Sequence, residues 1–505
     1  MSLGGLDVGT TVCRLIVFDD SGVVLTSAYR EYPLIQSQDR LEIDPEMMWE
    51  AVRDVCREAA EKIPEGDPLE AIAVSAMGDT LIATDKNFKS VHNALLAFDT
   101  RSKDQCDRLV DGLGFEEIHS VTGMPAHTMN SASKVLWLMD LTKEGDRVPD
   151  RFMCTEDFVI AKMTGCPVMS WTTAGRTMMF NRMSRKWWGE ILDYMEVSEE
   201  QLSTVVSPGT VAGKLTGSFV EYTGLSPDTV IVTAGHDQIS SAIGSGAVKD
   251  GMVSDNTGTF ECVIVGVGET RGAGIDMSML ARNNLAFYTH APAGLWAAFA
   301  WFNAGSAVNW CRDNLFSLEK EQALAGGEDI YEKMFQGLDD RVTTVLFQPH
   351  LTGAGTPWLN PFARGVLVDF DLGTDRYELL KAALQGIGYD LMANFDSFEE
   401  AGIAIQEIRA TGGGSQSPYW TQLKADMTGR MVTVPHYSEA SALGSVICAA
   451  SALGKFSSIV ESAEHLVKLG KTYEPDRKRH EIYRNGLERY RELYRSLDRY
   501  RGKGG

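Results

Sequence analysis

The sequence predicts an α/β protein built from two similar domains, and three observations lead to that prediction. The chain has 505 residues, more than one hydrophobic core usually supports. Strand-like and helix-like segments alternate along it, which is typical of α/β folds. A strand, a Gly/Thr turn and a second strand occur near the start and again halfway along the chain. We place the boundary near residues 247–251, which gives domains of residues 1–247 and 248–505.

The repeated pattern has the same order in both places. Asp7 ends the first apolar run and Gly9-Thr10-Thr11 follows it as a tight turn; in the second copy the turn is Thr257-Gly258-Thr259. Strands are predicted on both sides of each turn, at residues 3–7, 12–18, 252–255 and 260–265. Because such a unit recurs after half the chain, we expect duplicated domains that face one another.

The remaining elements follow from hydrophobic periodicity. Further strands are predicted at residues 23–28, 71–75, 81–84, 229–234 and 408–411. Helices are predicted at residues 45–62, 238–246, 376–401, 419–427 and 479–501. The richest apolar stretch, residues 295–310, contains three polar side chains and predicts an amphipathic or buried helix.

Composition limits the classes of partner. The formal charge of −22 argues against a nucleic-acid partner, which would need basic surface. Eight scattered cysteines without a CxxC pair predict reduced thiols, and the histidines form no metal-binding pattern. No apolar run has the length of a membrane span, and no signal-peptide pattern opens the chain. We therefore expect a cytoplasmic protein without a membrane partner.

The Gly/Thr turns have the chemistry of phosphate-binding loops. Glycine lets the backbone approach a ligand closely, and successive amides with threonine hydroxyls suit phosphate oxygens. At the first turn, Asp7 is a candidate to hold Mg²⁺ through water and Arg14 a candidate to face the phosphates. An ordinary hairpin remains the alternative for this turn alone.

A third glycine-rich segment follows the strand predicted at residues 408–411. Its residues are Gly412, Gly413, Gly414, Ser415 and Gln416, and a helix is predicted directly after it. A strand-to-helix loop of this kind presents bare backbone amides to a flat or charged ligand. The spacing differs from the GxGxxG fingerprint of dinucleotide-binding folds, so the sequence does not support NAD binding.

Together these motifs resemble the FGGY carbohydrate kinases, a family of the actin/Hsp70/hexokinase superfamily, over nearly the whole chain. The order and spacing of the motifs carry the resemblance. The matching segments are Leu6–Thr11, the segment from Asp157 to Thr164-Gly165, Ala234–Gln238 with Ala242–Gly246, Thr257–Thr259, Gly412–Ser417 with Gln422 and Ala425-Asp426, and Glu439–Gly444.

The resemblance implies two ribonuclease H-like (actin-like ATPase) domains with a cleft between them, ATP and Mg²⁺ as cofactors, and transfer of phosphate to a small sugar or polyol. It implies that Asp237 is the catalytic base, assisted by Asp7, with both carboxylates at the metal. Asp237 also follows a β-branched strand and opens a helix rich in small residues. The alternative from the residues alone is that Asp237 only caps that helix. A homodimer is a further expectation that the sequence does not decide.

Two departures from the family pattern fall on the sugar side. Where xylulokinases have Ser-Gly-Gln-Met-His-Gly, this chain has Ser75-Ala76-Met77-Gly78-Asp79-Thr80, so Asp79 replaces the sugar-contacting histidine. The family's W-x-D-x-R motif appears with Ala97 in place of the tryptophan, and its Asp99 is kept. Met77, Asp79, Asp99 and the proposed base Asp237 are the predicted substrate residues. Met77 is equally suited to a core, and Asp99 to an exposed pair with Arg101.

The first expectation for the substrate is a ketopentose such as D-xylulose, with gluconate, another sugar or a tetritol as alternatives. Two functions from other classes compete with the kinase. An actin-like filament or chaperone ATPase would need polymerising surfaces or a peptide-binding domain after the nucleotide core. A sugar-sensing regulator would need a DNA-binding module or a lost catalytic acid, whereas Asp7 and Asp237 are both present.

Overall fold

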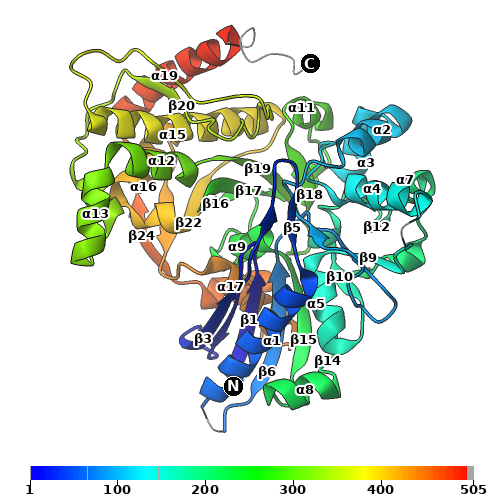
Figure 1. The fold of residues 1–505 in the computed structure, drawn as a ribbon. Helices are drawn as coiled ribbons and strands as arrows, with labels where there is room; N and C mark the ends of the chain where they lie inside the picture. Colours follow the sequence, from blue (N-terminus) through cyan, green and yellow to red (C-terminus); the bar gives the residue numbers. More distant parts are fainter. Residues whose placement is uncertain (1, 65, 146, 498–505) are drawn as a thin grey trace. The chain divides into compact units, whose positions relative to one another are not determined.

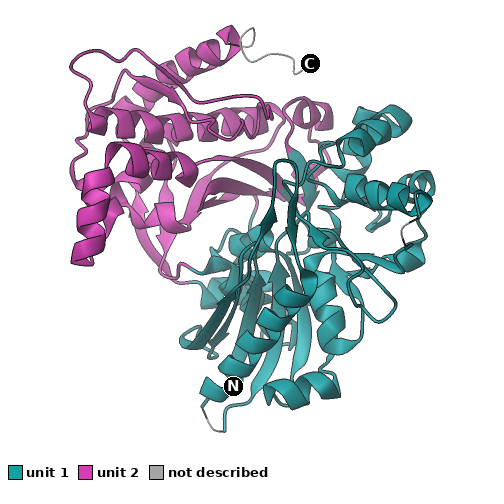
Figure 2. Cartoon of the chain, viewed as in Figure 1, with its two compact units in different colours: residues 1–249, 286–297, 439–467 teal, residues 250–285, 298–438, 468–505 magenta. Residues whose placement is uncertain are grey.

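The computed structural model describes residues 2–64, 66–145 and 147–497 and divides the chain into two compact units (Figure 2). Unit 1 comprises residues up to 249 together with residues 286–297 and 439–467. Unit 2 comprises residues 250–285, 298–438 and those from 468 onward. Each unit has its own sheet, and the chain passes between the units several times.

The sheet of unit 1 has six strands (Figure 1). Their order is β14 (Val211–Lys214), β15 (Val230–His236), β6 (Leu69–Ala76), β1 (Ser2–Val8), β2 (Val12–Phe18) and β3 (Val24–Glu31). The strands β1, β6 and β15 are parallel, while β2 and β3 form an antiparallel meander on one side and β14 is antiparallel on the other. The predicted first turn joins β1 to β2.

The sheet of unit 2 repeats this arrangement. Its seven strands are β18 (Ala286–Thr289, a segment of unit 1), β19 (Leu295–Asn303, which begins in unit 1), β17 (Phe260–Gly268), β16 (Met252–Thr257), β22 (Glu407–Thr411), β23 (Val432–Pro435) and β24 (Leu469–Tyr473), in this order. Again the strand before the turn, β16, pairs antiparallel with β17 and parallel with β22; β23 is parallel and β24 antiparallel. The prediction of duplicated α/β domains is therefore confirmed.

Helices cover both faces of the unit 1 sheet. Helix α17 (Ala440–Ala452) packs directly on β1, because a Cβ added to Gly5 would lie 2.1 Å from the carbonyl oxygen of Ala442. The next residue, Leu6, belongs to the buried cluster that holds α1 (Pro45–Lys62) and α5 (Thr155–Thr164). Since adjacent strand residues point to opposite faces, α17 covers one face and α1 and α5 the other.

Helix α9 (Asp237–Gly244) crosses α17 at small residues. A Cβ on Gly244 would lie 1.9 Å from the carbonyl oxygen of Ala440, and a Cβ on Gly444 would lie 1.8 Å from that of Ser240. These distances leave no space for any side chain, so the two backbones touch. Two of the segments that carry the family resemblance are thus the two sides of one close helix crossing.

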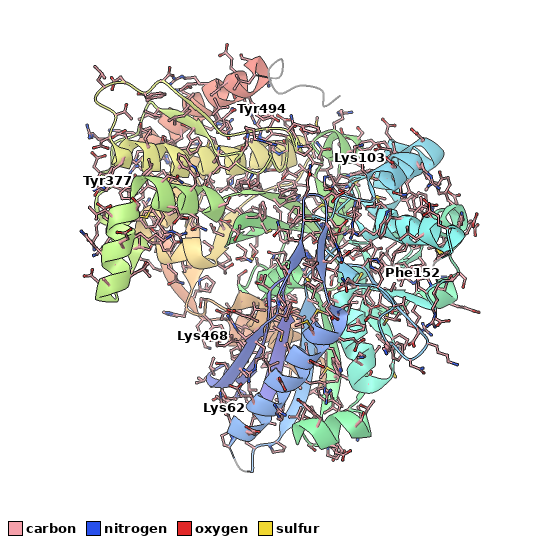
Figure 3. All side chains as sticks on the ribbon, viewed as in Figure 1. Lys62, Lys103, Phe152, Tyr377, Lys468 and Tyr494 are labelled. Carbon is pink, nitrogen blue, oxygen red and sulfur yellow. The ribbon has the colours of Figure 1, made fainter. Side chains whose placement is uncertain are left out.

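Three long helices characterise unit 2: α15 (Arg376–Glu400), α16 (Pro418–Thr428) and α19 (Arg477–Ser496). The last was predicted at residues 479–501, of which residues 498–501 lie outside the described part of the chain. Helix α19 is held by Tyr490, whose hydroxyl donates to buried Asp390 at 3.0 Å, and by Tyr494 (Figure 3), which stacks on Trp358 with ring centroids 4.1 Å apart. The indole of Trp358 donates to the same Asp390 at 3.1 Å.

The prediction of one helix at residues 295–310 is wrong. Strand β19 occupies the first part, Leu295–Asn303, and helix α12 (Gly305–Leu315) starts only after it. A continuous buried apolar run lacks the periodicity that distinguishes a strand from a helix, and its aromatic residues favour the strand.

Shorter elements complete the chain. The further helices are α2 (Lys103–Leu113), α3 (Phe115–Thr122), α4 (Ser131–Lys143), α6 (Trp171–Ala174), α7 (Gly189–Met195), α8 (Gly217–Thr223), α10 (Glu269–Gly272), α11 (Met277–Arg282), α13 (Ser317–Gly326), α14 (Ile330–Gln336) and α18 (Ile459–Leu466). The further strands are β4 (Ile35–Gln36), β5 (Leu41–Ile43), β7 (Ile82–Thr84), β8 (Ala94–Leu95), β9 (Arg151–Met153), β10 (Val168–Ser170), β11 (Phe180–Asn181), β12 (Lys186–Trp187), β13 (Thr204–Val206), β20 (Leu346–Gln348) and β21 (Val366–Val368). Across the described residues, no helix combines the length and apolarity of a membrane span.

The crossing of α9 and α17 gives a first prediction. Replacing Gly444 by alanine should destabilise unit 1 by about 2 kcal/mol, because the added methyl group forces the helices apart. Thermal unfolding followed by circular dichroism would measure the effect. Gly189→Ala in α7 is the matched control, since a Cβ there meets no described atom within 4 Å. Equal melting temperatures for the two variants would contradict the close crossing.

Candidate active site

Asp7 lies at the end of β1, directly before the first turn. The hydroxyls of Ser75 on β6 and Ser441 on α17 donate to its Oδ1 at 2.9 and 2.8 Å. Burial raises the pKa of Asp7, and the two serine hydrogen bonds oppose the rise. Both donors bind the same oxygen, so Oδ2 remains for a ligand.

Asp237 is the first residue of α9, one position earlier than the predicted helix start. It belongs to the first turn of the helix, where the amide groups favour a carboxylate. Its side chain is 23% exposed. Loss of hydration raises the pKa of Asp237 to about 7, and the charges of Asp7 and Asp79 contribute to the rise. A carboxylate with such a pKa can accept a proton near neutral pH.

His236 connects Asp237 to a neighbouring aromatic residue. Its Nε2 lies 3.2 Å from Asp237 Oδ1, and its Nδ1 lies 3.1 Å from the hydroxyl of Tyr288. Burial and the charge of Arg176 keep the pKa of His236 well below its usual range, so the ring is neutral. In the neutral tautomer with the proton on Nε2, the ring accepts from the hydroxyl of Tyr288 through Nδ1, and Nε2 lies beside Asp237.

Asp79 is buried and held by two cations. Arg176 Nη2 lies 2.8 Å from Asp79 Oδ2, and Lys134 Nζ donates to the carbonyl oxygen of Asp79 at 2.5 Å. The backbone of Asp79 adopts a left-handed conformation with φ of 60°. Its Oδ1 has no hydrogen-bond partner among the described residues although it is buried. An unpaired buried carboxylate oxygen is costly, which suits an oxygen that accepts from substrate hydroxyls.

Lys134 ties this loop to a second one. Besides Asp79, it donates to the carbonyl oxygen of Met129 at 2.7 Å. Burial lowers the pKa of Lys134 to about 8, and the charges of Asp79 and Asp99 oppose the fall. Lys134 therefore lies within electrostatic reach of both predicted substrate carboxylates.

The other predicted substrate residues are buried by protein contacts. Met77 is 6% exposed and packs in the core cluster of unit 1. Asp99 is 2% exposed; it accepts from the amide of Leu41 at 3.0 Å and pairs with Arg101 at 2.7 Å. Arg101 also binds buried Glu42. The alternative that Asp99 and Arg101 form an exposed surface pair is therefore wrong.

The first turn has the shape that the sequence predicts. The amide of Gly9 donates to the carbonyl oxygen of Val12 at 2.9 Å, which closes the turn. Thr10 and Thr11 are exposed, so their hydroxyls and amides are accessible to a ligand. The Arg14 guanidinium is half-buried and contacts the carboxylate of Glu439.

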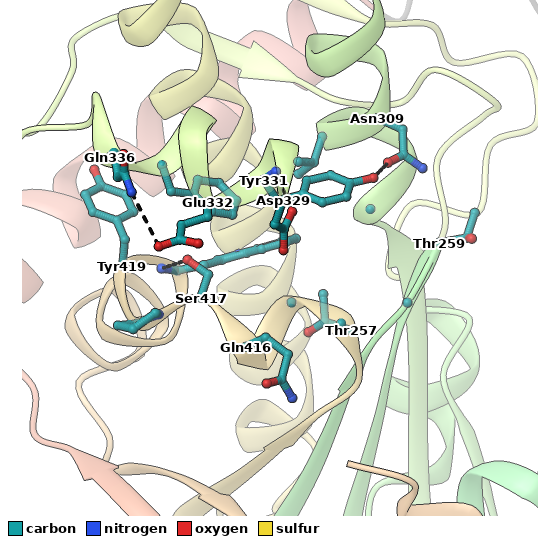
Figure 4. Close-up of a pocket in the computed structure, with 18 residues that line it drawn as sticks. Thr257, Thr259, Asn309, Asp329, Tyr331, Glu332, Gln336, Gln416, Ser417 and Tyr419 are labelled. Carbon is teal, nitrogen blue, oxygen red and sulfur yellow. Dashed lines mark hydrogen bonds between the residues drawn. The ribbon is translucent and has the colours of Figure 1, made fainter. Parts of the chain in front are cut away.

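The second turn and the glycine-rich loop line one cavity of about 780 Å³ in unit 2 (Figure 4). Thr257, Gly258, Thr259, Gly413, Gly414 and Gln416 are among its lining residues, whereas Gly412 and Ser415 support the loop from behind. A Cβ on Gly414 would lie 2.5 Å from Thr257 Cγ2, so the loop rests directly on the turn. Aromatic side chains from α14 and α16 also line this cavity: Tyr331, Phe335, Tyr419 and Trp420.

Backbone amides beside aromatic faces suit a nucleotide, since amides accept phosphates and rings stack on a base. No group of three or more metal-ligating side chains occurs in the described chain. Magnesium does not need one, because it retains waters and uses one or two carboxylates with substrate phosphates. Asp7, with one free carboxylate oxygen, fits that role.

The comparisons with known proteins agree with this chemistry. The description "FGGY family of carbohydrate kinases" applies to both matched segments, the N-terminal domain at residues 2–244 and the C-terminal domain at residues 257–453. The chain therefore belongs to the FGGY family of carbohydrate kinases. It is a phosphotransferase with an alcohol group as acceptor, and the family's phosphate donor is ATP.

Several relatives span almost the full length of the chain. A xylulose kinase of Staphylococcus epidermidis is 26% identical, covering 97% of this chain and 96% of its own. A gluconokinase of Bacillus subtilis is also 26% identical, with 97% and 93% covered. Among solved structures, a ligand-bound xylulose kinase from Lactobacillus acidophilus superposes with a TM-score of 0.88 at 25% identity, covering 98% of both chains. The predicted kinase class and actin-like fold are confirmed.

The sequence did not single out Arg176, Lys134 or Tyr288. Tyr288 comes from β18, more than 50 residues after His236, so no local pattern connects them. Arg176 follows a short helix in a segment of threonines and small residues, where one arginine gives no signal of a buried partner. Lys134 stands between Ser133 and Val135, and a lysine in such a mixed segment gives no signal of burial.

The buried pair of Arg176 and Asp79 gives a second prediction. Arg176→Leu should cost about 3 kcal/mol of stability, because it leaves Asp79 charged and without its cation. Adding Asp79→Asn should restore at least half of that loss. Thermal melts of both single variants and the double variant form the cycle that measures the coupling. Additive losses would show that the two side chains do not interact.

Proposed function

We propose that this FGGY kinase phosphorylates a neutral sugar or polyol, with Asp237 as the general base, and that a ketopentose such as D-xylulose is the first substrate to test. The raised pKa of Asp237, beside two further carboxylates, supports this proposal most strongly. The base takes the proton of the acceptor hydroxyl, and that oxygen then attacks the γ-phosphorus of ATP as the bond to ADP breaks.

Three carboxylates argue against an anionic acceptor. Asp7 and Asp79 both raise the pKa of Asp237, so each of them lies within electrostatic reach of Asp237. The cation Arg176 is already paired with Asp79, which leaves it little charge for a substrate carboxylate. A gluconate would add a fourth negative charge, while a neutral polyol offers hydroxyls that carboxylates accept. We therefore place the neutral ketose ahead of gluconate, the alternative from the sequence.

In this proposal Asp79 selects the substrate. Its free Oδ1 accepts from a hydroxyl of the sugar, and Arg176 and Lys134 hold the carboxylate and its backbone in place. Met77 and Asp99 support the site from behind, since protein contacts occupy both. His236 is neutral, so it orients the Asp237 carboxylate and leaves proton transfer to it.

Asp7 would hold Mg²⁺ on its free oxygen, directly or through water, with Asp237 as the second candidate ligand. Bound there with ATP, the ion would neutralise charge on the phosphate oxygens. The chain's own part is to present the Asp7 carboxylate in one orientation, which the two serine hydroxyls fix. Gly9, Thr10 and Thr11 follow it and offer their amides and hydroxyls to phosphate.

A substrate panel tests the reaction. ADP release by the purified protein with Mg-ATP would be measured across ketoses, tetritols, glycerol and aldonates. We expect a neutral ketose or polyol to stimulate release at least tenfold, and gluconate to give no stimulation. Stimulation by gluconate alone would overturn the argument from the three carboxylates and support the gluconokinase alternative.

The base has its own test. Asp237→Asn should lower kcat by at least 10²-fold while ADP binding stays within twofold, because general-base catalysis is typically worth that much. In the wild type, kcat should rise with pH and level off above about 7, since the base acts only when deprotonated. The wild-type pH–rate profile and the variant's turnover are measured together. An unchanged kcat in the variant would remove Asp237 from the mechanism.

A further inference from the structure

A buried group of charges lies behind the cavity of unit 2. Lys424 on α16 is 3% exposed, and Asp255 on β16 and Glu261 on β17 are fully buried. Lys424 Nζ lies 2.6 Å from Asp255 Oδ2, 3.1 Å from Glu261 Oε2 and 2.5 Å from Thr257 Oγ1. The three N–H groups of the ammonium thus have three acceptors. We call these four residues the Lys424 cluster.

The cluster is neutral when it holds one proton on its carboxylates. Glu261 Oε1 and Asp255 Oδ1 are buried and have no donor among the described side chains and amides. A proton on Glu261 agrees with the raised pKa of that residue, which burial and the charge of Asp255 cause. One ammonium, one carboxylate and one carboxylic acid then balance. Lys424 is therefore fixed in place by a closed set of partners.

Thr257 links this cluster to the cavity. Thr257 lines the cavity and touches the glycine-rich loop at two glycines. A Cβ added to Gly412 would lie 2.6 Å from the carbonyl oxygen of Thr257, and a Cβ added to Gly414 would lie 2.5 Å from Thr257 Cγ2. The turn at residues 257–259 and the loop at residues 412–416 therefore meet at Thr257. Its side chain is buried, and the Lys424 ammonium is a charge-assisted donor to its hydroxyl.

We infer that Lys424 is a positioning residue for the nucleotide: through Thr257 it holds the second turn and the glycine-rich loop at the spacing that the phosphates of ATP require. This inference rests on the proposed nucleotide site in unit 2. The cluster joins β16, β17 and α16, which are the three elements that carry the turn and follow the loop. Amides aimed at a phosphate bind well only when they are held before the ligand arrives.

The test compares two ligands that differ only in phosphate. Calorimetry measures the Kd of ADP and of adenosine, each with Mg²⁺, for the full chain and for Lys424→Met. We expect the variant to lose about tenfold in ADP affinity, the effect of one charge-assisted hydrogen bond, with adenosine affinity within twofold of wild type. In turnover assays KM for ATP should rise about tenfold while KM for the sugar stays constant.

A second variant separates positioning from stability. Lys424→Met leaves Asp255 without its cation and destabilises unit 2; adding Asp255→Asn removes that charge and should restore the melting temperature. We expect the affinity of this double variant for ADP to stay about tenfold lower than that of the wild type, because the hydroxyl of Thr257 still lacks its donor. Recovery of ADP affinity together with stability would overturn it and leave Lys424 a purely structural residue.

Lys381→Met supplies the matched control. Lys381 on α15 is a second buried lysine of unit 2, paired with Asp339 and Glu378, and it does not line the cavity. Its loss should lower stability and leave the Kd of ADP unchanged. A wild-type protein that binds ADP no more tightly than adenosine would refute the nucleotide site itself. Wild-type preference for ADP that Lys424→Met retains would refute only the role of Lys424.

Discussion

The structure depends on how its buried carboxylates are stabilised once they are removed from water. Removing an ionised carboxylate from water costs several kcal/mol unless cations or hydrogen bonds replace the lost hydration. In unit 1 the lost hydration is replaced in a different way at each of three acids. Asp79 receives a guanidinium, and Asp7 receives two serine hydroxyls that oppose the rise of its pKa caused by burial. At Asp237 loss of hydration raises the pKa to about 7, so this carboxylate can exchange a proton near neutral pH.

The internal repeat allows two equivalent acids of one chain to be compared. Asp255 stands two residues before Thr257 in the second copy, as Asp7 stands two residues before Gly9 in the first. In unit 1 the neighbouring strand offers Ser75, a neutral donor, opposite the acid; in unit 2 the neighbouring strand offers Ala410, and Lys424 approaches from a helix instead. Serine donors leave Asp7 ionisable and partly accessible, while the lysine neutralises Asp255 and seals it in. The two copies of the strand thus place an acid at the same position with different partners, two serine hydroxyls in unit 1 and a lysine in unit 2.

Features set by local sequence were predictable. The turns at residues 9–11 and 257–259, the strands beside them and the loop at residues 412–416 depend on glycine, threonine and short apolar runs, which act on their immediate neighbours. Strand β19 was missed because a run of buried apolar residues has no period. The family resemblance supplied Asp7 and Asp237, and their assigned roles remain proposals. Arg176, Lys134 and Lys424 were missed because each finds its aspartate through tertiary packing, at a separation of 55 residues or more along the chain.

The same cost of burying a carboxylate explains the surroundings of Asp79, which stands where the family pattern has a histidine. A histidine in its place would be neutral and would need no cation, whereas an aspartate at a buried position requires one. Arg176 supplies the charge, and Lys134 fixes the carbonyl of a residue whose left-handed backbone an aspartate tolerates better than most side chains. Burial and, second to it, the charge of Arg176 lower the pKa of His236 and keep the ring neutral beside Asp237. In the proposed mechanism, Arg176 therefore acts on both sides of the site, because it pairs with Asp79 on the substrate side and keeps His236 neutral beside the proposed base.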